Sequence, residues 1–258
     1  MDSKERRSTI DFAALNKRTP ARLGVGHAGP RYPTASMLKL RADHARALDA
    51  VANEIAADWP KRQGLIQLQS SAATRDIYLH HPELGRRLSR ESETALRKIV
   101  SLDSKKPRRD RTAAKPSLVI CVGDGLSSTA VERNAVGLLR ALKTLLAGHY
   151  TMLPAIFIRH ARVRIEDQVG AIASADLVCL LIGERPGLGT AESLSAYVIY
   201  RPSLKSLEAD RTVVSNIHAA GLKIPVAAAK IASLIDEMIA YRASGSKLAQ
   251  VLAERSAP

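Results

Sequence analysis

The chain has 258 residues, of which 46% are apolar, so it is long enough to bury one large core or two small ones. Lysine and arginine outnumber aspartate and glutamate by 39 to 25, and the formal net charge of +14 favours an anionic partner. No apolar stretch approaches the roughly 18 residues of a membrane span and the charged start MDSKERR precedes no secretory segment, so we expect a soluble, cytoplasmic protein.

The basic excess lies in the first part of the chain. Residues 1–115 hold 24 Lys and Arg against 13 Asp and Glu, which leaves the remainder nearly balanced. This distribution favours a basic face that docks on an acidic protein surface, because no aromatic platform for stacking bases accompanies the charge. A basic adaptor that binds nucleic acid remains an alternative.

Residues 1–33 are rich in Gly, Pro and Arg and show little periodicity, which indicates an extended arm. Apolar residues at helical spacing predict a long amphipathic helix from Thr34 until Trp59 and Pro60 end it. A second helix is expected over about 82–100.

A linker is expected at residues 105–116, where two prolines lie within a cluster of charges. It separates residues 34–104, expected to form a helical docking region, from a second domain at residues 117–258.

The second domain alternates short apolar runs with helical stretches. We expect strands at 117–122, 155–158, 176–182 and 195–200, and helices at 129–147, 165–173 and from Pro225 to about Ser244. This order predicts an α/β fold with a doubly wound, mostly parallel, Rossmann-like sheet. Cys121 and Cys179 lie in buried runs, where they are expected to pack rather than to form a disulfide.

Glycine-rich loops follow two of these strands, GDGLSS at 123–128 and GERPGLG at 183–189. In doubly wound sheets, ligands bind outside the carboxyl ends of the strands, so these loops are the candidate site. Glycine allows close approach of the backbone, and the start of the helix after GDGLSS offers free N–H donors.

Dinucleotide fingerprints are matched only in part. The GVGHAG run at 24–29 fits GxGxxG, but no strand precedes it and Pro30 follows. GDGLSS follows a strand but has Ser128 at the third glycine, and no acidic residue follows the second strand. A stand-alone NADP-binding oxidoreductase that uses Arg159 is kept as an alternative.

Other catalytic classes have little support in the sequence. The sequence has no HExxH motif and no cysteine pair at ligand spacing, so it gives little support to a metal site. Ser127 and Ser128 lack a GxSxG elbow and are expected to cap the following helix. We therefore expect no independent catalytic site on this chain.

Three polar runs, RVRIEDQVG, GERPGLGTAESLS and EADRTVVSNIH, together with GDGLSS and GHAGPRYPT, resemble the small (light) subunit of ethanolamine ammonia-lyase from about Arg22 onward. The resemblance implies an adenosylcobalamin-dependent lyase that converts ethanolamine to acetaldehyde and ammonia. It also implies a catalytic TIM-barrel large subunit as partner, in a hetero-dodecamer of six large and six small chains. The short start MDSKERRSTIDFAALNK leaves entry into a bacterial microcompartment open.

The same resemblance implies three cofactor contacts on this chain. Val163 would offer backbone and apolar surface, Glu184 would accept hydrogen bonds from corrin amides or the tail ribose, and Val213 would pack where relatives carry cysteine. No D-x-H-x-x-G run is present, so the cobalamin is expected to be base-on, with its own dimethylbenzimidazole on cobalt.

The remaining polar residues of these motifs have structural expectations. Glu166 and Asp167 open a helix, where the helix dipole stabilises carboxylates. A second set is expected to satisfy loop backbone or to line the subunit contact, namely Asp210, Arg211, Ser215, Asn216 and His218. Arg31, Asp43 and His44 are expected at the interface with the large subunit.

Overall fold

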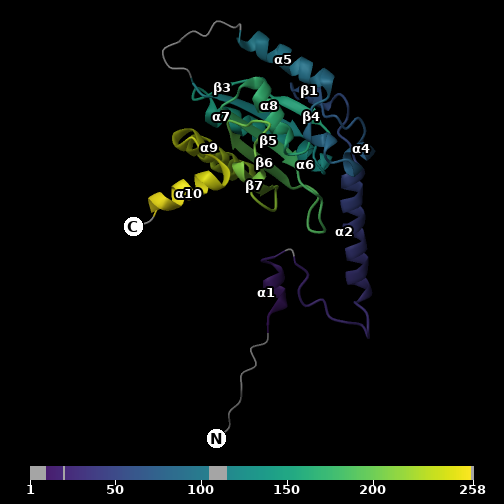
Figure 1. The fold of residues 1–258 in the computed structure, drawn as a ribbon. Helices are drawn as coiled ribbons and strands as arrows, with labels where there is room; N and C mark the ends of the chain where they lie inside the picture. The colour runs from purple at the N-terminus through teal and green to yellow at the C-terminus, as the bar shows by residue number, and fades with distance from the viewer. Residues whose placement is uncertain (1–9, 20, 105–114, 257–258) are drawn as a thin grey trace.

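One sheet of seven strands forms the centre of the molecule in a computed structural model that describes residues 10–19, 21–104 and 115–256. The strands lie in the order β1-β4-β2-β5-β6-β7, and β3 pairs with β2 outside this path. Their bounds are β1 (Ile66–Gln69), β2 (Ser117–Gly123), β3 (Thr151–Met152), β4 (Ile156–Arg159), β5 (Leu177–Gly183), β6 (Leu194–Tyr200) and β7 (Arg211–Ile217). Helices lie on both faces of this sheet (Figure 1).

Strand pairing is parallel from β1 to β5 and antiparallel at β6 and β7. The expected α/β fold with a mostly parallel sheet is therefore confirmed, whereas the antiparallel edge was not predicted. Strand β7 lies in the polar run 210–218, and β1 lies in residues 34–104, where only helices were expected. Both are edge strands, which carry a weaker apolar pattern than strands covered on all sides.

Ten α-helices are distributed along the described residues, with three short 3-10 or π segments. Those before the sheet's second strand are α1 (Phe12–Asn16), α2 (Thr34–Ala52), α3 (Trp59–Arg62), α4 (Arg75–His80), η1 (Leu84–Arg86) and α5 (Arg90–Ser104). Those after it are α6 (Ser128–Ala130), η2 (Val131–Ala135), α7 (Val136–Leu146), α8 (Ile165–Ala173), η3 (Glu208–Asp210), α9 (Ile224–Tyr241) and α10 (Gly245–Ser256).

Several helix bounds differ from the prediction for identifiable reasons. Helix α2 ends at Ala52, and Pro60 lies in the first turn of a separate helix, α3, where its fixed φ is favourable. The stretch 82–100 contains η1 and then α5. The expected helix at 165–173 is confirmed as α8, and α10 after Ser244 was missed. The expected linker, 105–116, lies outside the described residues except for its last two.

Two hydrophobic cores lie on the two faces of the sheet, because successive side chains of a strand point to opposite faces. Leu118, Ile120 and Val122 pack with residues of α7 and α9, whereas Val119 and Cys121 pack with residues of α5 and α8. Cys179 lies in the first core and Cys121 in the second, and both are buried free thiols. The expectation that the cysteines pack without a disulfide is confirmed.

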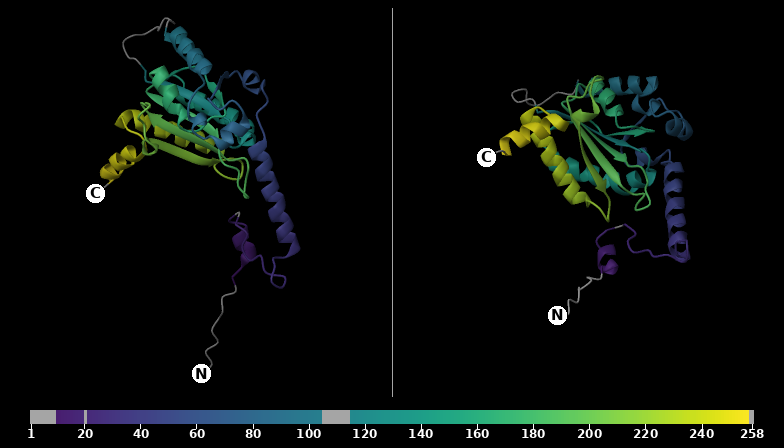
Figure 2. Two further views of the ribbon diagram at one scale, coloured as in Figure 1. Left: turned by 45° about the vertical axis from the view of Figure 1, so that its right-hand side comes forward. Right: turned by 60° about the horizontal axis from the view of Figure 1, so that its bottom comes forward.

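Helix α2 extends away from the sheet and carries the arm at its far end (Figures 1 and 2). Only Asp43 and Ala50 of this helix are buried. Asp43 forms ion pairs with Arg22 and Arg46, so it joins the arm to the helix. Leu38 and Leu48, at 59% and 57% exposure, leave apolar surface open on α2.

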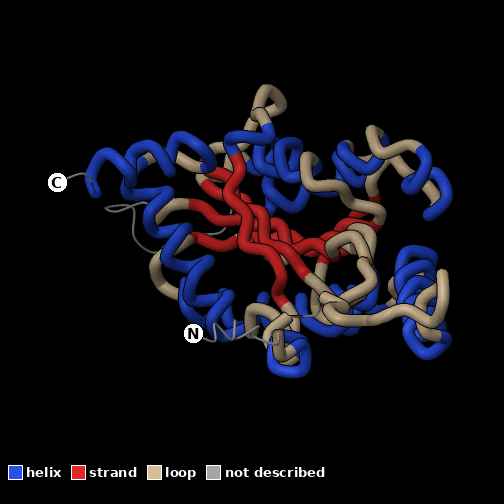
Figure 3. Tube along the Cα trace, turned by 90° about the horizontal axis from the view of Figure 1, so that it is seen from below, coloured by secondary structure: helices blue, strands red, loops and turns tan. Residues whose placement is uncertain are grey.

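The chain reverses its direction across the sheet beside β2. After β2 it continues to β4 on one side, and after β4 it crosses to β5 on the other side of β2. A switch point of this kind leaves a crevice outside the carboxyl ends of the two central strands. Figure 3, which views the molecule from below, shows loops in front of the ends of the strands.

Candidate functional site

The loops that follow β2 and β5 meet at this crevice in direct backbone contact. The N–H of Leu126 donates to the carbonyl of Gly183 at 3.1 Å. Gly125 has a φ of +59°, and a Cβ atom there would lie 2.2 Å from the same carbonyl oxygen. A Cβ on Gly183 would lie 2.2 Å from the carbonyl oxygen of Ser127. Only glycine fits at either position, so this pair of glycines sets the close approach of the two loops.

The start of the helix after β2 is held by serines. Ser127 accepts a hydrogen bond from the N–H of Ala130 at 3.1 Å, which confirms its predicted capping role. Ser128 instead donates to the carbonyl of Asn53 at 2.8 Å. The loop is thereby joined to the end of α2.

A hollow of about 480 Å³ opens beside this loop contact, between the ends of β5, β6 and β7 and the loop that follows β4. Val163 before α8, Glu184 after β5 and Val213 on β7 all line it. The three residues singled out from the resemblance therefore lie together, although they are 50 residues apart in sequence at the extremes. A shared position is a necessary condition for a shared ligand.

Glu184 is held by one of its two carboxylate oxygens. Its Oε1 accepts a hydrogen bond from the Ser195 hydroxyl at 2.7 Å and another from the N–H of Asn216 at 2.9 Å. Within the described residues, Oε2 has no hydrogen bond. The carboxylate is thus fixed in place and keeps one oxygen available to accept hydrogen bonds from a ligand.

Val213 reaches the hollow because the run 210–218 forms strand β7. Val214 and Ile217 are buried against the sheet core, whereas Val213 is 46% exposed. Val213 pairs with Tyr197 of β6, which lines the same hollow. The adjacent β-branched residues Thr212 and Val213 were the available signal for a strand.

Tyr78 and Arg162 close one side of the hollow and were not predicted as site residues. Tyr78 is fully buried, and its hydroxyl donates to the carbonyl of Ala161 at 3.1 Å. Burial raises the pKa of this hydroxyl, so Tyr78 is a neutral wall. The Arg162 guanidinium lies 4.2 Å from the centre of the Tyr78 ring.

Behind this wall, Asp124 and Arg75 join the loops to one another. The buried Asp124 carboxylate accepts from the N–H groups of His160 and Ala161 at 2.9 and 3.1 Å. Arg75 donates to the carbonyls of Gly125 and Leu126 and, through Nε, to the carbonyl of Val51. Burial raises the pKa of Asp124, whereas its hydrogen bonds and the nearby cations oppose this shift.

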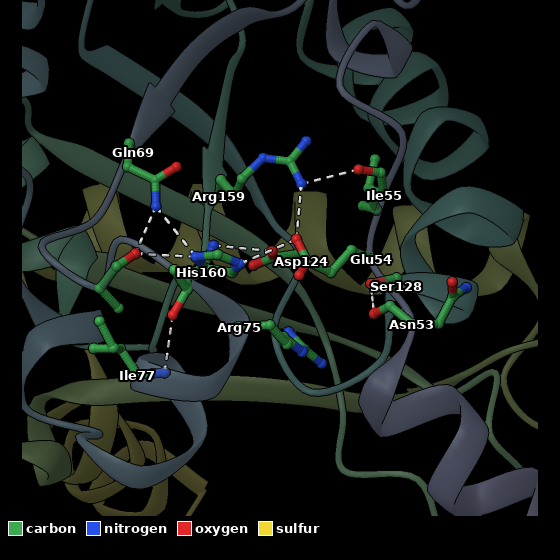
Figure 4. A network of polar contacts seen from close by, with 12 residues as sticks. Asn53, Glu54, Ile55, Gln69, Arg75, Ile77, Asp124, Ser128, Arg159 and His160 are labelled. Atoms are coloured by element: carbon green, nitrogen blue, oxygen red, sulfur yellow. Dashed lines mark hydrogen bonds and ion pairs between the residues drawn. The ribbon is translucent and has the colours of Figure 1, made fainter.

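His160 and Arg159 continue this network toward the end of α2 (Figure 4). The His160 Nδ1 lies 3.0 Å from the carbonyl oxygen of Ala72, and its ring stacks on Tyr78. Arg159 donates to the carbonyl of Ile55 at 2.9 Å and is 12% exposed. Because Arg159 has an internal partner and does not line the hollow, the structure offers no support for its use by an NADP phosphate.

A second group of charged side chains lies at the start of α8 and of β7 and is buried. Arg211 donates through Nε to Glu166 at 2.7 Å and contacts both oxygens of Asp167. All three side chains are 5% exposed or less. Glu166 and Asp167 do lie in the first turn of α8, as predicted, and Arg211, which was expected in a loop or an interface, joins them to β7.

Burial raises the pKa of Glu166 to about 8, because desolvation outweighs the attraction of Arg211 and Asp167 adds a second negative charge. The pKa of Asp167 is also raised by burial. One guanidinium is therefore paired with two buried carboxyl groups, and ionisation of both at once is unfavourable in free energy.

Two further properties concern the described residues as a whole. Within residues 10–19, 21–104 and 115–256, no three His, Cys, Asp or Glu side chains are placed to bind a metal ion. None of the helices in these ranges combines the length and the apolar character needed to cross a membrane.

Comparison with known proteins agrees with the sequence motifs. A family model described as ethanolamine ammonia-lyase light chain (EutC) matches residues 10–249. The ethanolamine ammonia-lyase small subunits of Lachnoclostridium phytofermentans and Listeria monocytogenes serotype 4a are 40% and 42% identical to this chain over 239 and 238 residues. The corresponding protein of Clostridium perfringens is 40% identical over 238 residues. Each alignment covers 92% of this chain and 77% of the relative.

Proposed function

The chain belongs to the ethanolamine ammonia-lyase light-chain family, and we propose that it is the small subunit of an adenosylcobalamin-dependent enzyme that converts ethanolamine to acetaldehyde and ammonia. Its role is to supply one wall of the cofactor pocket, while the large subunit supplies the substrate site and the catalytic groups. The convergence of Val163, Glu184 and Val213 on one hollow at the switch point of the sheet is the observation that supports this proposal.

The hollow has the chemistry that part of a corrinoid needs. At about 480 Å³ it is in the range of pockets that hold ordinary small ligands, so a cofactor as large as cobalamin would extend beyond it. The remainder would be enclosed by the second chain. Val163 and Val213 offer apolar surface, and the free oxygen of Glu184 can accept hydrogen bonds from amides or from a ribose hydroxyl.

When bound, adenosylcobalamin supplies radical chemistry, and the protein binds, orients and shields it. Three features of this chain suit those tasks: a fixed carboxylate at Glu184, a neutral buried wall at Tyr78, and loops fixed by Gly125 and Gly183. We propose a base-on cofactor, since the sequence has no motif that would replace the lower base by histidine.

The partner in this proposal is the large subunit, in an assembly of six large and six small chains. The arm at residues 1–33, of which 1–9 and 20 lie outside the described residues, and the region 34–104 would provide the docking face. Residues 117–258, together with Tyr78 of the preceding region, would contact the cofactor. Exposed Leu38 and Leu48 on α2, with exposed Arg31 and His44 nearby, suit a contact with apolar and acidic surface on another chain.

Co-expression with the large subunit tests this function directly. We expect the complex, with added adenosylcobalamin, to release ammonia from ethanolamine, and neither subunit to do so alone. Glu184→Ala should weaken cofactor binding by about 10- to 100-fold, the value of a hydrogen bond to a charged group. Glu132→Ala, which removes an exposed carboxylate outside the hollow, serves as the control. Turnover by the isolated chain would contradict the proposed function, and unchanged affinity of Glu184→Ala would contradict the assigned contact.

A further inference from the structure

Arg162 is held rigidly at the wall of the hollow. Its backbone N–H donates to the carbonyl of Gly85 at 2.8 Å, and its Nη2 donates to the carbonyl of Tyr78 at 3.0 Å. A Cβ on Gly85 would lie 2.6 Å from the Arg162 Cγ, so the glycine leaves space for the arginine stem. With the guanidinium over the Tyr78 ring, the side chain is confined before any ligand arrives.

Apart from this ring contact, the positive charge of Arg162 has no anionic partner within the described residues. A guanidinium has five N–H donors, and within the described residues this one donates a single hydrogen bond, to the carbonyl of Tyr78. Nε is buried without a partner, and no carboxylate forms an ion pair with this side chain among the residues that the structure describes. A buried donor without a partner carries a desolvation cost that an anion would remove.

Arg162 is partly buried, and two buried arginines of the described chain show what a purely structural role looks like. Arg75 donates three hydrogen bonds to main-chain carbonyls. Arg211 is neutralised by Glu166 and Asp167. Arg162 has neither a full set of main-chain acceptors, as Arg75 has, nor carboxylate partners, as Arg211 has, although its side chain is held in place.

The hollow itself has an excess of positive charge. Two arginines, Arg162 and Arg185, line it against a single carboxylate, Glu184. Arg185 is exposed, and no ion pair of it is found among the described residues. An anionic group fits this arrangement, and arginine binds phosphate oxygens with particular geometric complementarity.

We propose that Arg162 binds the phosphodiester of the cobalamin nucleotide tail, with Arg185 as a second, outer cation. The inference rests on the proposed function and extends it, because it assigns an anion-binding residue and an orientation of the ligand. The phosphate lies toward Tyr78 and Arg162, and groups that donate hydrogen bonds lie toward Glu184.

Adenosylcobinamide and adenosylcobinamide phosphate provide the sharpest test, because they differ only in the phosphate group. Binding of each to the complex of both subunits is measured by equilibrium dialysis with absorbance detection. We expect the phosphate compound to bind about 10- to 100-fold more tightly to the wild-type complex. Arg162→Gln should reduce this ratio to about one and leave the affinity for adenosylcobinamide unchanged, which also shows that the variant is folded. Arg162→Lys should retain part of the ratio, because lysine offers charge without the planar donor pair.

Arg164→Gln is the matched control. Arg164 is two residues away, lies outside the hollow, donates to the carbonyl of Ser206 and pairs with Asp167 and Glu208. Because any shift of Asp167 would affect both compounds alike, removal of Arg164 should leave the ratio of the two affinities unchanged. Inorganic phosphate should weaken binding of adenosylcobinamide phosphate and not of adenosylcobinamide if the site takes phosphate in general.

The inference is overturned if the two compounds bind equally to the wild-type complex, or if Arg162→Gln keeps the wild-type ratio. Binding of neither compound would instead count against the proposed function, so the two failures are distinguishable.

Discussion

Two groups of charged side chains, one at the start of α8 and β7 and one lining the hollow, differ in how their charges are compensated. In the first, Arg211, Glu166 and Asp167 are buried and their charges are paired with one another, although Glu166 Oε2 accepts no hydrogen bond. In the second, Arg162 and Glu184 are fixed by backbone and side-chain contacts but keep donors or acceptors without a partner. The difference indicates that the first group serves the fold and the second serves a ligand, although both are built from the same residue types.

The two groups are also mechanically connected. Arg211 opens β7 two residues before Val213, and Glu166 lies three residues after Val163 at the start of α8. The buried ion pairs therefore set the spacing between two walls of the hollow. We call Arg211, Glu166 and Asp167 the closed group, and Arg162 and Glu184 the open group. A change in the closed group should lower the free energy of unfolding first and weaken ligand binding as a consequence.

Arg211→Met should have the largest effect on the free energy of unfolding. It removes the guanidinium that bonds to the buried Glu166 and Asp167 side chains, and breaking a buried ion pair in this way costs about 3–5 kcal/mol. Arg201→Met is the control, because Arg201 is 69% exposed and its pair with Asp176 spans 3.5 Å. A surface pair of this kind contributes about 1 kcal/mol or less. Urea denaturation of both variants measures the difference in the free energy of unfolding. Equal decreases in the two variants would show that the buried ion pairs of Arg211 contribute no more to stability than the surface pair of Arg201.

The pH dependence of stability should sharpen the comparison within the closed group. The pKa of Glu166 is raised from 4.5 to about 8 in the folded chain. A raised pKa means that its contribution to stability is complete below about pH 4.5 and is lost as the pH rises toward about 8. Glu166→Gln cannot ionise, so its free energy of unfolding should decline less over this range than that of the wild type.

Part of the decline should persist in Glu166→Gln, because burial also raises the pKa of Asp167. Glu132→Gln, which alters an exposed carboxylate, should follow the wild-type curve. Denaturation curves at several pH values provide the measurement. Parallel declines of Glu166→Gln and the wild type would show that Glu166 does not titrate in this window.

Ser195→Ala should have a smaller effect, confined to the open group. Ser195 is 2% exposed and donates to Glu184, so it acts as a positioning residue for that carboxylate. Loss of one such hydrogen bond, at about 1 kcal/mol, corresponds to roughly fivefold weaker cofactor binding. Ser215→Ala is the control, since Ser215 lines the same hollow without a hydrogen bond to Glu184.

Absorbance titration of the assembled enzyme with adenosylcobalamin measures these affinities. The half-saturating cofactor concentration should rise in Ser195→Ala, while kcat at saturating cofactor stays near the wild-type value. A fall in kcat without a change in affinity would assign Ser195 a role other than positioning Glu184.

The sequence predicted the loops of the site better than it predicted their surroundings. Gly125 and Gly183 were found because a ligand loop after a buried strand has a local signature, whereas Glu184 was singled out only by the resemblance to a known family. Tyr78 and Arg162 were missed, since their contact joins positions 84 residues apart and leaves no local pattern. Arg211 was placed in a loop or an interface, because a polar run gives no sign that two carboxylates 44 and 45 residues earlier will bury it.

Val213→Cys should have the smallest effect. Relatives are expected to carry cysteine at this position, and valine has nearly the same volume, so the proposed packing contact with the cofactor would be kept without the thiol. Val213 is 46% exposed on β7 in the absence of a partner, with room at the hollow for either side chain. We therefore expect Val213→Cys to change cofactor affinity by less than about twofold, the scale of a volume-conserving apolar exchange. Val213→Asp places a carboxylate on the same apolar wall and should weaken binding well beyond that. A gain of tenfold or more in Val213→Cys would instead give the sulfur atom a specific role, and the open group would then include a third residue that acts through its chemistry and not through its shape.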